Sequence, residues 1–70
     1  MKEGKMYIVR ILIGDSVVYF NGQYMRGLYQ SSETLDKAYA TKLTASQAHE
    51  VGMYYQRMYM YRFELERAEW

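Results

Sequence analysis

The sequence predicts a small α+β domain in which an antiparallel β-meander of three to five strands carries one α-helix on a face, in the order βββ(β)-α-β. Three patterns predict it: apolar runs separated by turn residues, a helix-capping sequence at Thr44, and a closing segment with period-two hydrophobicity. Seventy residues, half of them hydrophobic, make one domain over residues 1–70 with a core near the lower size limit. We expect residues 1–4 to be disordered.

The first two strands follow from residues 6–20. Residues 6–13 read Met-Tyr-Ile-Val-Arg-Ile-Leu-Ile, which is apolar on both faces and therefore typical of an interior strand. Gly14-Asp15 is a two-residue turn pattern. Residues 16–20 (Ser-Val-Val-Tyr-Phe) then predict a second, antiparallel strand.

Asn21-Gly22 is the strongest local turn pattern in the chain. Both residues tolerate the positive φ that a type I′ turn requires, and strand-like runs flank them. Residues 23–29 are therefore predicted as a third strand, antiparallel to the second, which completes the meander. Gly27 inside it indicates a bulge or a close backbone approach.

The segment that follows is polar and carries two short elements. Ser31 or Ser32 is expected to cap a helical turn through residues 35–37. Residues 39–43 alternate, with Tyr39, Thr41 and Leu43 on one face, and predict a short strand.

Thr44 opens the helix. Thr44-Ala-Ser-Gln47 is a capping box, in which the Thr hydroxyl and the Gln side chain each bond a backbone N–H of the first turn. Ala48, Val51 and Tyr55 follow at helical spacing and are expected to face the sheet. Gly52 costs about 1 kcal/mol relative to Ala in a helix interior. It either lets the helix approach the sheet or ends the helix early.

The last third of the chain fits two patterns. Tyr59, Tyr61, Phe63 and Leu65 alternate with polar or flexible residues, which predicts a final strand. A helical register through the same residues would give one helix of about 25 residues, about 37 Å long at 1.5 Å per residue. That length would overhang a sheet of short strands. We favour a helix that ends near Gln56 and a strand after it.

Reactive groups are scarce. The chain has no cysteine and a single histidine, His49, so neither a disulfide nor a zinc finger can form. The five glycines are scattered and form no phosphate-binding loop. Glu64 and Glu66 stand beside Arg62 and Arg67 and indicate a solvated face of mixed charge. We expect no catalytic residue, no metal and no cofactor, and hence no enzyme.

Charge and hydropathy exclude further classes. The net charge of +1 argues against both an acidic DNA mimic and a strongly basic DNA binder. The longest apolar run, residues 7–13, is interrupted by Arg10 and is far shorter than the roughly 20 residues of a membrane helix. No signal-peptide pattern opens the sequence. A cytoplasmic protein is therefore expected, with no membrane partner.

A protein-binding role is the favoured function. The nine tyrosines supply large contact area with a polar tip and little rotamer entropy. Methionines interleaved with tyrosines near the end of the helix exceed what so small a core can absorb, and an exposed apolar patch marks protein contacts. The predicted contact residues are Tyr54, Arg57, Met58, Tyr59, Met60 and Arg62.

Two alternatives stay open. A sheet face bearing Tyr24, Arg26 and Tyr29 would suit a single-stranded nucleic-acid-binding module, because tyrosine stacks on bases and arginine contacts phosphates. A structural or oligomerisation module, such as a homodimer, is the other.

The order of these patterns resembles small accessory proteins of bacteriophages and mobile elements. The resemblance covers residues 6–51: the Tyr/Ile/Val-rich strand, Tyr-Phe-Asn-Gly at 19–22, Leu-Asp-Lys-Ala-Tyr-Ala-Thr-Lys at 35–42, and the Thr-capped helix with Ala48. Many such proteins look like βββ(β)-α-β domains. The resemblance implies an anti-CRISPR-like or other anti-defence inhibitor that binds a host or defence-system protein in the host cytoplasm. Without the acidic character of DNA mimics, it would act by occluding a protein surface.

Overall fold

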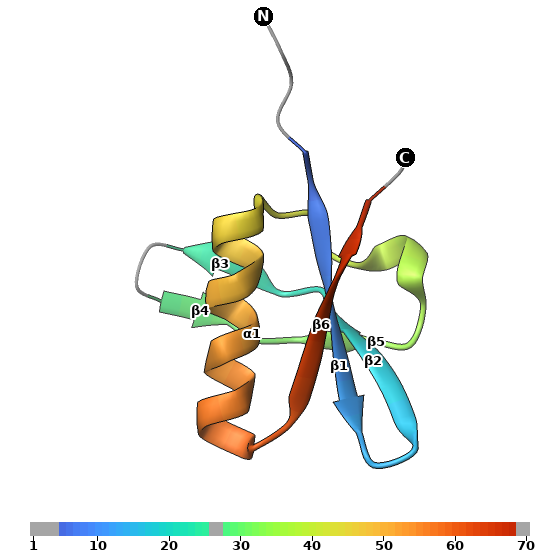
Figure 1. Cartoon of the computed structure of the whole chain (residues 1–70). Helices are drawn as coiled ribbons and strands as arrows, with labels where there is room; N and C mark the ends of the chain where they lie inside the picture. Colours follow the sequence, from blue (N-terminus) through green and yellow to red (C-terminus); the bar gives the residue numbers. More distant parts are fainter. Residues whose placement is uncertain (1–4, 26–27, 69–70) are drawn as a thin grey trace, which may run out of the picture.

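The computed structural model describes residues 5–25 and 28–68 and confirms an α+β domain (Figure 1). A four-stranded antiparallel sheet has the order β5-β2-β1-β6, and β3 and β4 form a separate antiparallel pair. The elements are β1 (Tyr7–Ile13), β2 (Ser16–Phe20), β3 (Gln23–Met25), β4 (Leu28–Gln30), β5 (Glu33–Thr34), the 3-10 helix η1 (Lys37–Tyr39), α1 (Ala45–Tyr59) and β6 (Arg62–Arg67).

Strand β1 lies inside the sheet, as its two apolar faces predict. It pairs with β2 through a turn at Gly14, whose φ is +59°, and with β6 on its other side. Ile11 lies opposite Val18 in one neighbour and opposite Phe63 in the other. The first hairpin and the interior position of β1 are therefore confirmed.

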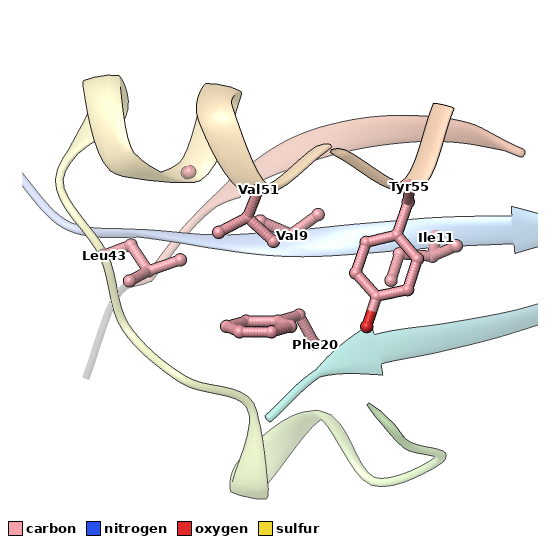
Figure 2. Close-up of a cluster of buried hydrophobic side chains, with 7 residues drawn as sticks. Val9, Ile11, Phe20, Leu43, Val51 and Tyr55 are labelled. Carbon is pink, nitrogen blue, oxygen red and sulfur yellow. The ribbon is translucent and has the colours of Figure 1, made fainter. Parts of the chain in front are cut away.

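The core lies between α1 and one face of the sheet (Figure 2). Val51 and Tyr55 point from the helix toward Val9 and Ile11 of β1, and the ring of Phe20 meets that of Tyr55 edge to face at 6.2 Å. The capping box is confirmed: the hydroxyl of Thr44 accepts from the N–H of Gln47 at 3.2 Å, and the Gln47 side chain accepts from the Thr44 N–H at 3.2 Å. The buried core residues are Val9, Ile11, Phe20, Leu43, Ala48, Val51 and Tyr55.

Gly52 allows α1 to lie against β6. A Cβ at this position would stand 2.2 Å from Cδ2 of Phe63, so no larger residue fits without displacing the ring. The helix continues past Gly52 to Tyr59, three residues beyond the predicted end near Gln56. Strand β6 then begins at Arg62, which confirms the helix-then-strand interpretation and excludes a single long helix.

The predicted type I′ turn at Asn21-Gly22 is wrong. Among the described residues, positive φ occurs at Gly14 and Met60 and not here. At Gly22 the chain leaves the sheet, and a Cβ there would lie 1.8 Å from the carbonyl oxygen of Gln30. Glycine is required here because the backbone of Gln30 passes so close. The N–H of Asn21 donates to the carbonyl of Ser32 at 2.8 Å where the chain returns to the sheet.

The predicted third strand is consequently divided. Residues 23–25 pair with residues 28–30 as β3 and β4, and the neighbour of β2 in the sheet is β5 instead. The meander thus ends after two strands. Gly27, predicted to mark a bulge or a close backbone approach, lies outside the described residues, as do residues 1–4, predicted to be disordered.

Residues 31–43 also differ from expectation. Asp36, and neither Ser31 nor Ser32, caps the helical turn: its carboxylate accepts from the N–H of Ala38 at 3.0 Å. The predicted strand over residues 39–43 is wrong apart from Leu43, which exchanges two backbone hydrogen bonds with Tyr7, of 2.6 and 2.8 Å. The pairing of β2 with β1 stops at Arg10, so the backbone N–H and C=O of Tyr7 on that side of β1 are available to Leu43.

Replacing Gly52 by Ala tests the close approach of the helix. Alanine normally favours a helix by about 1 kcal/mol over glycine, but here the added methyl would overlap the ring of Phe63. We expect Gly52→Ala to lower the free energy of unfolding by about 1–3 kcal/mol, the usual cost of overpacking. Urea unfolding followed by circular dichroism measures it. Gln56→Ala, an exposed change in the same helix, is the control, and a Gly52→Ala protein as stable as the original would contradict the packing.

Candidate functional site

The predicted contact residues gather where α1 ends and the chain turns into β6. This end of the helix lies at the same end of the domain as the β1–β2 turn (Figure 1). Exposed fractions are 61% for Met58, 49% for Tyr59 and 87% for Met60. With the exposed Arg57 they form what we call the helix-end surface (Arg57, Met58, Tyr59, Met60). Tyr54, also predicted, is partly buried beside it.

Met60 reverses the chain at the helix end in a strained conformation. Its φ of 61° and ψ of 28° place it in the left-handed region, and its N–H donates to the carbonyl of Gln56 at 2.9 Å. Glycine ordinarily occupies this helix-ending position, because a Cβ disfavours left-handed backbone. A long apolar side chain is thus held on strained backbone and directed into solvent. Nothing in the sequence around Met60 predicts this conformation.

A groove of about 590 Å³ runs beside the helix-end surface. It is lined by Arg57 and Met60 on the helix side and by Leu12, Arg62 and Glu64 on the sheet side. The structure therefore brings together three of the predicted residues, Arg57, Met60 and Arg62, around one groove. The lining therefore combines apolar side chains with charges of both signs, from two arginines and one glutamate.

Four tyrosines connect this surface to the core. The ring of Tyr59 stacks on that of Tyr61 at 5.4 Å with an interplanar angle of 20°, and it lies 5.9 Å from the ring of Tyr55. Tyr55 is 2% exposed, and its hydroxyl donates to the carboxylate of Glu33 on β5. Tyr54 contacts both Tyr55 and Tyr59 edge to face. The exposed ring of Tyr59 therefore rests on the buried ring of Tyr55 and on the half-buried rings of Tyr54 and Tyr61.

Sequence reasoning missed part of this cluster. Tyr55 was expected in the core, but its bond to Glu33 and the supporting role of Tyr61 were not foreseen. The spacing of Tyr55 and Tyr59, four residues apart on a helix, does predict that the two rings meet. The contact with Glu33 crosses 22 positions of sequence and has no local signature.

The environment raises the pKa of two phenols of the cluster, Tyr55 and Tyr59. Burial raises the pKa of Tyr55 far above its ordinary value, and the hydrogen bond to Glu33 raises it further. The neighbouring Tyr54 raises the pKa of Tyr59, because charge on both rings would be repulsive. The phenols of Tyr55 and Tyr59 therefore stay protonated to higher pH than a free tyrosine and can act as hydrogen-bond donors.

The residues of the nucleic-acid alternative lie elsewhere. In the backbone register of the β3–β4 pair Tyr24 is the partner of Tyr29, while Arg26 lies outside the described residues. The hydroxyl of Tyr24 donates to the carboxylate of Glu50 on α1 at 2.8 Å, and its ring packs against the core. A carboxylate at this position disfavours a bound phosphate. The alternative stays a prediction without added support.

Other titratable groups have structural contacts. His49 is exposed and meets the ring of Phe63 edge to face at 6.0 Å. Glu64 lies 3.7 Å from Arg10, and Glu66 pairs with Lys37, so the face of mixed charge is present. Within residues 5–25 and 28–68, no three His, Asp or Glu side chains come together as metal ligands.

Comparison with known proteins leaves the surface itself as the guide to function. No protein-family model, curated protein or solved structure matches the chain. The one α-helix of the described residues is too short and too polar to cross a membrane.

Removing the Tyr55 hydroxyl should change how stability depends on pH. A raised pKa in the folded state means that the stability contributed by Tyr55 is present below pH 10, the ordinary value for tyrosine, and is lost as pH rises above it. Tyr55→Phe should lower the free energy of unfolding by about 1 kcal/mol near neutral pH. Above pH 10 the difference in unfolding free energy between Tyr55→Phe and the original protein should narrow, as measured by urea unfolding. A gap that stayed constant into the alkaline range would contradict the assignment, and Tyr39→Phe is the exposed control.

Relieving the strain at Met60 should stabilise the domain. Glycine adopts the left-handed conformation without the Cβ penalty, and the Met60 side chain is 87% exposed, so little packing is lost. We expect Met60→Gly to raise the free energy of unfolding by about 1 kcal/mol. Met60→Ala, which keeps the Cβ, serves as the control and should give no such gain. A Met60→Gly protein less stable than the original would show that Met60 is not strained.

Proposed function

We propose that this chain is a non-enzymatic protein-binding inhibitor that occupies a surface of another protein through the helix-end surface. The observation that carries the proposal is Met60. Its side chain is 87% exposed on left-handed backbone, at a position where glycine would be more stable. Strain that the chain's own packing does not repay is typical of residues retained for contact with something else.

The composition of the surface describes the partner. Met58 and Met60 are flexible and adapt to irregular apolar surfaces. Tyr59 is rigid because Tyr61 and Tyr55 hold its ring, and tyrosine with arginine dominates binding energy at protein interfaces. Arg57 adds a cation at the edge. The expected partner presents an apolar hollow bordered by carboxylates.

Inhibition by occlusion is the mode we infer. The resemblance to small accessory proteins of phages and mobile elements favours a host or defence-system protein as the target, with an anti-CRISPR-like inhibitor as one form. A net charge of +1 gives no basis for imitating DNA. Covering part of the partner's surface needs no chemistry from the chain itself.

Capture experiments with matched variants test the proposal. The tagged protein would be incubated with lysate of the cells in which it acts, and the retained proteins would be quantified. We expect one protein at stoichiometric amounts, with retention reduced at least tenfold by Tyr59→Ala, Arg57→Ala or Met60→Gly. Because Met60→Gly should be more stable than the original, unfolding could not explain its loss of binding.

Leu35 and Tyr39 provide the controls. They are 79% and 70% exposed; Leu35 lies between β5 and η1, and Tyr39 is the last residue of η1, which lies away from the end of α1 (Figure 1). Leu35→Ala and Tyr39→Ala should keep full retention. The proposal fails if no protein is retained stoichiometrically, or if control and helix-end variants lose it equally. Binding of a single-stranded oligonucleotide that weakens steeply with salt would support the nucleic-acid alternative instead.

A further inference from the structure

Strand β6 presents a free sheet edge. Among the described strands it pairs with β1 alone, and its six residues far exceed the two of β5 at the opposite edge. An edge of this length offers a row of backbone N–H and C=O groups to another strand. The groove beside the helix-end surface reaches this edge through Arg62, Phe63 and Glu64.

The hydrogen-bond phase shows which groups point outward. The N–H of Ala68 donates to the carbonyl of Met6 at 2.9 Å, so alternate residues of β6, Arg62, Glu64 and Glu66, bond to β1. The N–H and C=O groups of Phe63, Leu65 and Arg67 therefore face away from the sheet. A strand added at this edge would bond to these residues.

The charges of β6 are self-complementary. We infer that β6 pairs antiparallel with β6 of a second copy of this chain, centred on Glu64, so that the two sheets become continuous. Arg62 then lies opposite Glu66 of the partner subunit, twice by symmetry, and Phe63 lies opposite Leu65 of the partner subunit. Arg62 and Glu66 occupy non-hydrogen-bonded positions, where facing side chains are closest.

Neighbouring registers are less favourable. A shift of two residues one way would place Glu64 opposite Glu66 of the partner subunit at two positions. The opposite shift would also pair Arg62 with Glu64 of the partner subunit at two positions, but only residues 62–64 of each strand would then pair, against residues 62–66 in the inferred register. It would place Glu66 against Met60 of the partner subunit, which is left-handed and outside the strand. In the inferred register the two Glu64 side chains meet on the symmetry axis, where each has its own Arg10 at 3.7 Å to offset the repulsion.

The signs of its charges also distinguish the β6 edge from an edge strand that is protected against pairing. Natural edge strands avoid pairing by carrying charges, lysine above all, that repel a like neighbour. Strand β6 carries Arg62, Glu64, Glu66 and Arg67, whose mixed signs attract an antiparallel copy. The helix-end surface (residues 57–60) lies before β6 in the chain and takes no part in the strand pairing. The inferred dimer therefore does not depend on the proposed function.

Charge reversal with mixing tests the inference. Light scattering after size exclusion should give the original protein the mass of two chains, against 8.4 kDa for one. Arg62→Glu and Glu66→Arg should each weaken the dimer about tenfold or more, because each places like charges opposite at two positions. A mixture of the two variants should restore the dimer, since both facing pairs become opposite in sign.

A charge change away from β6 provides the control for the two β6 variants. Lys42→Glu makes an equal charge change beside Leu43, on the other side of β1, and should leave the dimer intact. Circular dichroism verifies that each variant is folded. Hydrogen exchange on the original protein should show protection of the Phe63 and Leu65 amides that increases with concentration. A single-chain mass at millimolar concentration, variants that remain dimeric, or a mixture that stays monomeric would each overturn the inference.

Discussion

The close contact between Gly52 of α1 and Phe63 of β6 is the constraint on which the rest of the domain depends. With no Cβ between them, the helix lies near enough to the sheet for Val51 and Tyr55 to reach the core formed by β1 and Phe20. In a chain of 70 residues the core has few members, so each such contact carries a large share of the stability. A helix held further away would leave those side chains half exposed.

That contact also creates the candidate site. Because β6 begins three residues after α1 ends and returns along the helix, the chain must reverse within Met60 and Tyr61. The left-handed conformation of Met60 accomplishes the reversal without a glycine. The strain, the exposure of Met60 and the stacking of Tyr59 on Tyr61 are therefore consequences of one geometric requirement.

The same arrangement separates two surfaces by chemistry. The helix-end surface is apolar with a cationic border, and the proposed contact with another protein rests on that chemistry. The edge of β6 offers regularly spaced backbone groups flanked by charges of both signs, which suits an identical strand. Arg62 stands between them, since it lines the groove beside Met60 and also belongs to the strand. The proposed dimer would use Arg62 and leave Met58, Tyr59 and Met60 at its two ends.

Sequence alone predicted those features whose causes are local. The interior position of β1 follows from its two apolar faces, the start of α1 from the Thr44 capping box, and β6 from its period of two, and all three are confirmed. The exposed side chains at the helix end were also foreseen, because a small core cannot enclose so many large residues. Local sequence patterns are sufficient for the first three features, and the length and composition of the chain for the last.

The tertiary structure decided everything that depends on distant partners. Asn21-Gly22 carries the residues of a type I′ turn, yet Gly22 is used where the backbone of Gln30 crosses, and β5 replaces β3 beside β2. The bond between Tyr55 and Glu33 and the left-handed Met60 likewise arise only once the sheet and helix are packed. Local conformational preferences of about 1 kcal/mol are smaller than the free energy gained by burying a shared core. That free energy is gained only when segments distant in sequence pack together.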